Sequence, residues 1–352
     1  RFRRSTERRL GTTSVVRSGG STMFMKHRAR KGATYALLLG AASLALASCS
    51  SAKVGSPATT AAATTKCGTV TLADNAWVGY EANLAVVAYV AKTKLGCTVA
   101  IKHISEEISW QGFASGEVDA ILENWGHADL AKKYITDQKV AVDLGPTGNK
   151  GIIGWYVPPF LATKYPDILD YKNLNKYASL FKTSESGSKG AFLDGDPSYV
   201  TNDEALIKNL KLNFKVIYTG SEAALITAFR NAEAQKKPMI GYFYEPQWFL
   251  SEVALKHVAL PPYTVGCDAV AAKVACDYPP YILNKVASVK FMNSGSPAAS
   301  LIKNFTWTND DQNSVAKSIN DSKLTDPIAA DDAAAKAWVD ANPDKVNAWL
   351  AG

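Results

Sequence analysis

From Gly68 onward, apolar and polar positions follow two different periods along the chain. Short apolar runs with a period of two predict strands, and longer runs with a helical period lie between them. The first block has strands at 69–74, 98–104 and 118–123, with helices at 80–96 and 106–116. Alternation of strand and helix predicts a mostly parallel sheet with right-handed crossovers.

A second block of the same kind follows a strand that ends in Pro158-Pro159. It predicts strands and helices in alternation at 190–196, 202–210, 214–220, 221–235 and 238–246. The tail from about Tyr278 is predicted to be helical. Strands at 151–157 and 239–248 cross between the blocks, which predicts two lobes joined by two chain crossings, with a ligand cleft between them.

Large aromatic side chains stand where predicted strands of the first block end. Trp77 closes "LADNAW" and Trp125 closes "AILENW", and His127 follows two residues later. In open α/β sheets, ligands bind outside the carboxyl ends of the strands. These positions therefore indicate a ligand that is recognised by aromatic faces.

Five segments in this order resemble the substrate-binding proteins of glycine betaine/choline ABC transporters: "ADNAW", "GEVDAILENW", "TGSEAALITAF", "YEPQW" and "AAKAWVDANPDKVNAWL". The resemblance covers about residues 68–350. It implies an α/β, two-lobe fold of the type II periplasmic-binding-protein kind, with two hinge crossings. We expect lobe 1 to comprise 67–155 plus 250–352, and lobe 2 to comprise 156–249.

The family resemblance implies an aromatic cage for a quaternary ammonium group. Such a group cannot donate N–H hydrogen bonds, and ring faces attract it at ~0.5–2 kcal/mol each. Trp77, Trp125 and Tyr244 are the implied cage members. The resemblance leaves open whether Trp155 or Tyr156 joins them. Because side chains alternate along a strand, only one of the two can face the cleft, and we favour Trp155.

A betaine also carries a carboxylate, which needs donors. The backbone N–H groups of residues 77–80 precede a helix and predict an anion site at its N-terminus. His127 and Asn202 are further polar candidates, together with Ser198 and Tyr199. Choline-selective relatives look as though they place an acid two residues after the first cage tryptophan. Here that position is Gly79, which favours a zwitterion.

The net charge of +7 is concentrated in the leader. Residues 1–49 hold ten Lys/Arg and one acid, so the remainder carries a net charge of −2 and gives no reason to expect nucleic-acid binding. We interpret 1–48 as a leader with a lipoprotein signal peptide, because a basic segment precedes a short apolar run. "LASC" resembles a lipobox, which implies lipidation of Cys49, and 49–66 reads as a flexible tether.

The other cysteines are even in number, which suggests disulfides in an exported protein. Cys67 and Cys97 begin two predicted neighbouring strands, which predicts a Cys67–Cys97 bridge. Cys267 and Cys276 flank a short hairpin-like segment, which predicts Cys267–Cys276. No cysteine or histidine has zinc-ligand spacing, and no calcium loop is complete, so we expect neither metal nor cofactor.

The sequence thus predicts a non-enzymatic, extracytoplasmic, monomeric receptor. No nucleophile, metalloprotease or phosphate-loop motif occurs in it. It would close on glycine betaine or a related quaternary ammonium osmolyte, deliver it to an ABC permease with its ATPase, and be held at the membrane by its lipid. Two alternatives stay open: a choline- or carnitine-specific binder, and a sensory or structural solute-binding lipoprotein without a role in transport.

Overall fold

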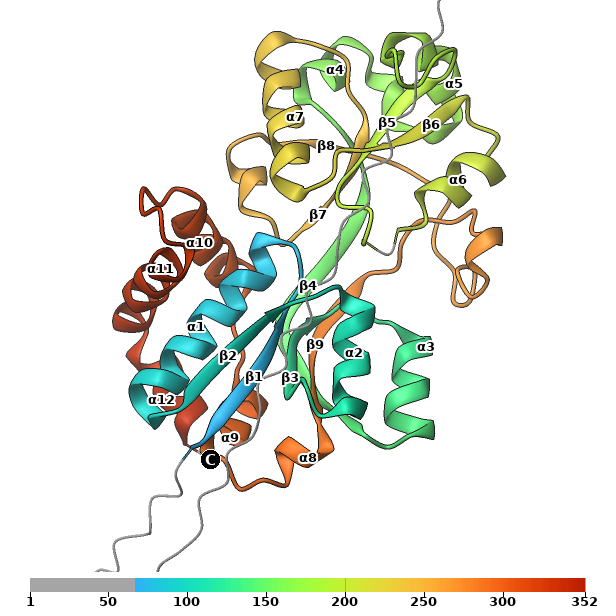
Figure 1. Cartoon of the computed structure of the whole chain (residues 1–352). Helices are drawn as coiled ribbons and strands as arrows, with labels where there is room; N and C mark the ends of the chain where they lie inside the picture. The colour runs from blue at the N-terminus through green and yellow to red at the C-terminus, as the bar shows by residue number, and fades with distance from the viewer. Residues whose placement is uncertain (1–66, 200, 352) are drawn as a thin grey trace, which may run out of the picture. The chain divides into compact units, whose positions relative to one another are not determined.

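The computed structural model describes residues 67–199 and 201–351, which belong to one compact unit. Cys49, the signal peptide and the tether lie outside the described residues. In the described part, the strands follow the order β2-β1-β3-β9-β4-β7-β5-β6, and β8 pairs with β4. We use "first lobe" for β1, β2, β3, β9 and the start of β4 with their helices, and "second lobe" for β5 to β8 and the end of β4 with theirs (Figure 1).

The first lobe begins with the predicted alternation of strands and helices. The parallel pairs β1–β2 and β1–β3 place the carboxyl ends of β1 and β3 at one edge of the sheet. The elements are β1 (Thr69–Asp74), α1 (Val78–Leu95), β2 (Thr98–His103), α2 (Glu106–Ser115) and β3 (Ala120–Asn124). The strand and helix predictions for this block are confirmed.

One long strand runs through both lobes. β4 (Ala141–Val157) pairs antiparallel with β9 (Tyr281–Ser288) in the first lobe and with β7 (Gly241–Glu245) in the second. The pairing partner changes between Gly151 and Ile152. The predicted crossing at 151–157 therefore belongs to a strand that is hydrogen-bonded on both sides of the junction.

The second lobe repeats the parallel pattern. β5 pairs in parallel with both β6 and β7, and β8 adds an antiparallel strand to the end of β4. Its elements include α4 (Pro159–Lys164), α5 (Leu174–Tyr177), β5 (Gly190–Asp194), α6 (Asp203–Asn209), β6 (Phe214–Tyr218), α7 (Glu222–Gln235) and β8 (Lys256–Val258).

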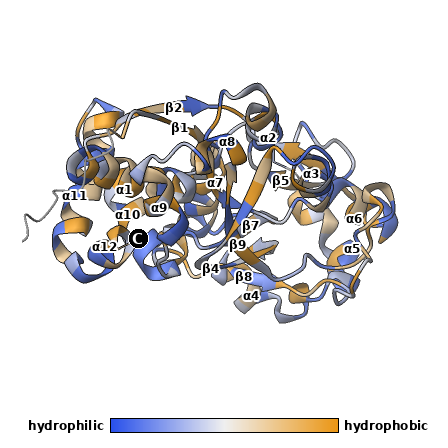
Figure 2. Cartoon of the chain, turned by 90° about the horizontal axis from the view of Figure 1, so that it is seen from below, coloured by the Kyte–Doolittle hydropathy of each residue, from blue (hydrophilic) through white to orange (hydrophobic). Residues whose placement is uncertain are grey.

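Further helices complete the first lobe. Contacts of α1 with α9, α10 and α11 place the C-terminal helices over one face of its sheet (Figure 1). These helices carry both apolar and polar residues (Figure 2). Helix α12 buries Val346 and Trp349. The bounds are α3 (Ala128–Ala131), α8 (Val289–Met292), α9 (Pro297–Asn304), α10 (Asn309–Asn320), α11 (Pro327–Ala341) and α12 (Pro343–Leu350).

The prediction for the start of the tail was wrong. Residues 281–288 form strand β9 between β3 and β4, where Leu283, Lys285 and Val286 are buried. Sheet pairing on both edges explains the strand, because helical periodicity alone cannot report such neighbours. The segment at 239–248 does not lead the chain directly back to the first lobe. It is followed by β8, which pairs with the end of β4, and the chain then returns to the first lobe through β9. The lobe boundaries expected from the sequence stay a prediction.

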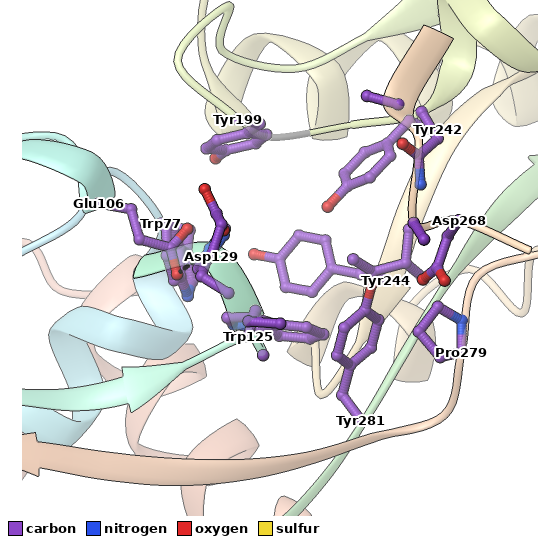
Figure 3. A pocket seen from close by; sticks show the side chains of 17 residues that line it. Trp77, Glu106, Trp125, Asp129, Tyr199, Tyr242, Tyr244, Asp268, Pro279 and Tyr281 are labelled. Carbon is purple, nitrogen blue, oxygen red and sulfur yellow. Dashed lines mark ion pairs between the residues drawn. The ribbon is translucent and has the colours of Figure 1, made fainter. Parts of the chain in front are cut away.

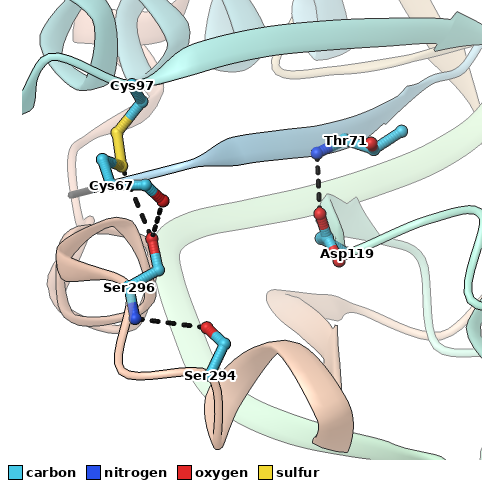
Figure 4. The surroundings of a disulfide bond; sticks show 6 residues. All are labelled: Cys67, Thr71, Cys97, Asp119, Ser294 and Ser296. Atoms are coloured by element: carbon cyan, nitrogen blue, oxygen red, sulfur yellow. Dashed lines mark hydrogen bonds between the residues drawn. A yellow bond between two sulfur atoms is a disulfide. The ribbon is translucent and has the colours of Figure 1, made fainter. Parts of the chain in front are cut away.

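Both cysteine pairs are bonded in the structure. Cys67 and Cys97 lie at the starts of β1 and β2, with their Cα atoms 4.8 Å apart. Ser296 donates its hydroxyl to the carbonyl of Cys67 at 2.8 Å, which ties this edge to the loop before α9 (Figure 4). Cys267 and Cys276 close a nine-residue separation in the loop between β8 and β9.

Candidate solute-binding site

A cavity of about 500 Å³ is lined by residues of both lobes (Figure 3). Its volume lies in the range of ~300–1,000 Å³ that is typical of small-molecule sites. The lining includes residues after β1 and β3, residues of β7 and residues of the loop before β9. Six of them are aromatic: Trp77, Trp125, Tyr199, Tyr242, Tyr244 and Tyr281.

Two tryptophans reach the cavity because the strands before them are neighbours. Trp77 is the residue before α1, and Trp125 directly follows β3. Since β1 and β3 are parallel, their carboxyl ends meet at the same edge of the sheet. Both indoles are half-buried and contribute to the cavity wall.

A buried carboxylate orients both indoles. Oε1 of Glu123 accepts a hydrogen bond from Nε1 of Trp77 at 2.8 Å and from Nε1 of Trp125 at 2.9 Å. Oε2 accepts from the side-chain amides of Asn83 at 2.6 Å and Gln312 at 2.8 Å. Burial raises the pKa of Glu123, and these four hydrogen bonds oppose the increase. The indole planes are therefore fixed by a polar group behind the cavity wall.

Trp125 also depends on the absence of a side chain at Gly151. A Cβ atom at this position of β4 would lie 2.5 Å from Cζ3 of Trp125. Real Cβ atoms essentially never come so close, so the indole can occupy this place only against a glycine. Glu123 and Gly151 together define where the ring of Trp125 sits.

Strand β7 supplies two rings from the second lobe. Tyr242 and Tyr244 are two residues apart and so project from the same face of the strand. The ring of Tyr244 meets that of Trp125 edge to face, with centroids 5.7 Å apart and an interplanar angle of 90°. This contact brings an aromatic residue of each lobe together at the cavity.

The remaining rings join these into one continuous row. Tyr199 approaches Trp77 at 5.9 Å and Tyr242 at 6.1 Å between ring centroids. Tyr281, the first residue of β9, approaches Trp125 at 5.5 Å. The hydroxyl of Tyr199 donates to the carbonyl of Ala76 at 2.8 Å, which links the lobes beside Trp77.

A second buried carboxylate connects the lobes. Glu222, the first residue of α7, accepts the hydroxyl of Tyr244 and the amide of Gln247 on Oε1. Its Oε2 accepts the backbone N–H of Val78, at the start of α1, at 2.8 Å. Burial raises the pKa of Glu222 to about 7, although these hydrogen bonds lower it.

The polar lining is dominated by acids. Glu106, Asp129 and Asp268 line the cavity, and Nε2 of His127 lies 2.8 Å from Oε1 of Glu106. Burial lowers the pKa of His127, but Glu106 and neighbouring acids outweigh it, so the pKa is raised. Among the lining residues that the structure describes, there is neither lysine nor arginine.

Most of the residues predicted from the sequence do meet at this cavity. Its lining contains Trp77, Trp125, His127, Asn202 and Tyr244. They come from segments as far apart in the sequence as β1 and β7. The predicted binding of a ligand at the strand ends required these segments to meet. Their contact with a ligand remains a prediction.

Trp155 lies elsewhere. It stands opposite Tyr242 in the β4–β7 register and so shares its face of the sheet. Its indole, however, donates to Asp203 at 2.7 Å and packs on Phe192, with centroids 4.5 Å apart, inside the second lobe. Ile153, two residues earlier, takes the place on the cavity wall. The prediction placed Trp155 on the correct face of β4. It did not foresee that Trp155 lies beyond the cavity, within the second lobe.

Tyr156 and Gly79 do not line the cavity either. Tyr156 projects from the other face of β4, where its ring lies 5.1 Å from that of His257. Gly79 is buried within α1, and a Cβ there would lie 2.6 Å from Nε2 of Gln312. A larger residue at this position would require the amide of Gln312 on α10 to move.

Sequence reasoning missed other residues of the site. Tyr242 had a usable signal, since it lies two residues before Tyr244 on one strand. Tyr199 was expected only as a polar candidate, and its place in the aromatic wall depends on the loop that carries it. Tyr281 begins strand β9, which the sequence did not predict. Glu123 and Glu222 gave no signal, because a sequence does not tell a buried acid from an exposed one.

Two kinds of feature are missing from the described residues. In that part of the chain, no group of three or more His, Cys, Asp or Glu side chains is arranged to hold a metal ion. Likewise, none of its helices is both long and apolar enough to cross a membrane.

The fold and cavity define a class of protein: a two-lobe solute-binding protein whose ligand site lies between α/β lobes. Residues 68–341 match the family model of the substrate binding domain of ABC-type glycine betaine transport systems. The chain belongs to this family. The α/β two-lobe fold predicted from the sequence is thereby confirmed, as is the resemblance on which it depended.

Individual relatives are more distant. The chain is 28% identical over 138 residues to a glycine betaine/carnitine transport binding protein of Listeria monocytogenes serotype 1/2a (strain 10403S), a match that covers 39% of each chain. It is 24% identical over 249 residues to a trimethylamine N-oxide-binding protein of Pelagibacter ubique (strain HTCC1062), covering 67% of this chain and 78% of the relative.

Solved structures share the fold. The lactococcal OpuAC protein in its closed-liganded conformation with glycine betaine matches with a TM-score of 0.63 and 22% identity, covering 80% of this chain and 99% of that one. A choline-binding protein of an ABC transporter in complex with choline matches with a TM-score of 0.64 and 18% identity, covering 81% and 92%.

Proposed function

We propose that this chain is an extracytoplasmic receptor that binds glycine betaine or a related quaternary ammonium solute and delivers it to an ABC importer. The observation that carries the proposal is the row of six aromatic rings around one cavity. A quaternary ammonium group spreads its charge over methyl groups, and each ring face attracts it by ~0.5–2 kcal/mol. Three or four rings would together supply roughly 2–8 kcal/mol before ordering costs, and micromolar binding corresponds to about 8 kcal/mol.

The cage would combine residues of both lobes. Trp77, Trp125 and Tyr244 keep the roles expected from the sequence, and Tyr242 and Tyr281 extend the aromatic wall. His127 and Asn202 would contact the polar end of the solute. Because rings of both lobes surround one cavity, solute binding and lobe closure would favour each other.

The transport role rests on the family and its relatives. A receptor of this kind acts as a monomer, consumes nothing and passes its solute to a permease. We propose that lipid on Cys49 holds it outside the cytoplasmic membrane, with a tether whose r.m.s. reach is roughly 20–25 Å. Two acyl chains supply stable anchoring.

Titration calorimetry with glycine betaine, proline betaine, carnitine and choline tests the binding proposal. We expect saturable one-to-one binding of at least one of them, with Trp125→Ala weakening it by about tenfold or more. Tyr218→Ala is the matched control, since this ring is exposed on β6 and lies outside the cavity. If none of the four solutes binds, or if both variants bind as the wild type does, the proposal is wrong.

A further inference from the structure

The start of α1 is already occupied by a carboxylate of the protein. A helix N-terminus attracts an anion, and the sequence predicts that the acid end of a betaine would bind here. In the structure, the N–H of Val78 donates to Oε2 of Glu222, which reaches across from α7. Glu222 is 93% buried and keeps both oxygens within hydrogen-bonding distance of donors. One of the backbone N–H groups expected to hold a ligand carboxylate, that of Val78, is thus already paired with Glu222.

The donors of the aromatic row are also used within the protein. Both indole N–H groups donate to Glu123. The hydroxyl of Tyr244 donates to Glu222, and that of Tyr199 donates to the carbonyl of Ala76. Four of the six rings therefore direct their polar hydrogens to protein acceptors. What they present to a solute is aromatic surface, which suits methyl groups and positive charge rather than a carboxylate.

The charges of the wall point the same way. Glu106, Asp129 and Asp268 line the cavity, and His127, beside Glu106, is the one basic side chain among the described lining residues. Glu123 and Glu222 lie directly behind the rings, with hydrogen bonds to three of them. A solute carboxylate would enter a field of like charges, which costs affinity unless donors compensate for it.

We infer that the solute of this receptor is a net cation without a carboxylate, such as a trimethylammonium alcohol, and that Glu222 is the residue that sets this selectivity. The inference rests on the proposed function and narrows it. It replaces the expectation of a zwitterion that Gly79 suggested. Glu222 acts by placing a carboxyl oxygen at the start of α1, and in its ionised form it also places a negative charge behind Tyr244.

Choline and glycine betaine form a matched pair of probes, because they share the trimethylammonium group and differ in a hydroxymethyl against a carboxylate. Calorimetry on the purified chain at pH 8, above the pKa of Glu222, should give choline at least about tenfold tighter binding than glycine betaine. Choline binding should also weaken as salt rises, because the acids of the wall attract it. Equal or tighter binding of glycine betaine overturns this inference and leaves the proposed function intact. Binding of neither probe, nor of any other quaternary ammonium solute, overturns both.

The variant Glu222→Gln tests the assigned residue. It keeps the shape of the side chain and removes its charge, so the ratio of choline to glycine betaine affinity should fall by about tenfold. Glu204→Gln, on the exposed side of α6 in the same lobe, should leave the ratio unchanged. Asp268→Asn removes a charge from the half-buried wall and should lower the affinity for choline but not that for glycine betaine. This second variant keeps the test valid if Glu222→Gln does not fold. An unchanged ratio in a folded Glu222→Gln variant, or equal losses for both probes in Asp268→Asn, contradicts the inference.

Discussion

Trp77 and Trp125 share one hydrogen-bond acceptor, because both indole N–H groups donate to Oε1 of Glu123 at 2.8 and 2.9 Å. The two rings come from different strand ends, 48 positions apart, and yet one side chain sets the orientation of both. The geometry of the first-lobe wall should therefore respond to changes at a residue that does not itself line the cavity.

Replacement of Glu123 tests this dependence. Glu123→Leu would leave two indoles and two amides without their acceptor, and each unsatisfied buried group costs about 1–3 kcal/mol. We expect the free energy of unfolding in denaturant to fall by several kcal/mol and solute binding to weaken. Glu123→Gln should lose less, since its amide oxygen can still accept both indole N–H groups. Equal stability of the two variants would speak against a positioning role.

Trp155 should matter for stability and not for binding. Trp155→Phe keeps an aromatic ring beside Phe192 but removes the hydrogen bond to Asp203, which is fully buried. We expect a loss of about 1–3 kcal/mol in unfolding free energy and an affinity within about twofold of the wild type. A large loss of affinity in a stably folded variant would return Trp155 to the cage.

Stability should depend on pH through Glu222. Its pKa is raised from 4.5 to about 7, with Glu81 of α1 adding to the effect of burial and Tyr244 opposing it. The folded protein thus holds a proton that the unfolded chain releases. The contribution of this group is complete below pH 4.5 and is lost as pH rises through 7.

This pH dependence should disappear in Glu222→Gln. Relative to that variant, the wild type should lose at most ~1.4 kcal/mol of unfolding free energy per pH unit between pH 4.5 and 7. Denaturant unfolding of both proteins at several pH values measures the difference. A constant difference across this range would show that the carboxyl does not titrate there.

The two disulfides should differ in their effect on binding. Cys267–Cys276 closes the loop that contributes Asp268, Ala269 and Ala271 to the cavity wall. Replacing both cysteines with serine should cost about 2–3 kcal/mol of stability through the loop entropy of the unfolded chain and should also weaken solute binding.

Cys67–Cys97 provides the matched comparison. It lies at the amino ends of β1 and β2, at the opposite end of these strands from the cavity. Its serine double variant should lose stability but keep its affinity. Similar affinities for the two double variants, measured by calorimetry under conditions where both are folded, would contradict the assigned role of the loop.

Much of this architecture could be predicted because it depends on local patterns. Apolar periodicity located the strands β1, β2, β3, β5, β6 and β7 and the helices between them, and the rule for strand ends brought Trp77 and Trp125 to one edge. The strand at 281–288 escaped because its pairing with β3 and β4 involves segments that are distant in sequence. The depth of Trp155 within its lobe likewise depends on Asp203 and Phe192, which periodicity does not report.

The polar half of the site was less accessible to sequence reasoning. Whether an acid such as Glu222 faces solvent or reaches the start of a helix 144 residues earlier depends on how the lobes meet. The expectation of a zwitterion came from one position, Gly79, which is packed against Gln312 and lies outside the cavity lining. A glycine can record a packing constraint, and its meaning is known only when its neighbours are.

Gly151 is a glycine whose packing constraint concerns the family as a whole. Because a methyl group there would occupy the space of the six-membered ring of Trp125, the two positions cannot change independently. Across related receptors, residue sizes at these two sites should covary, with a bulkier residue on the strand accompanied by a smaller ring or none. Evolution of a new solute preference in this lineage would then require paired substitutions, and single changes at either site would first pass through a weaker binder.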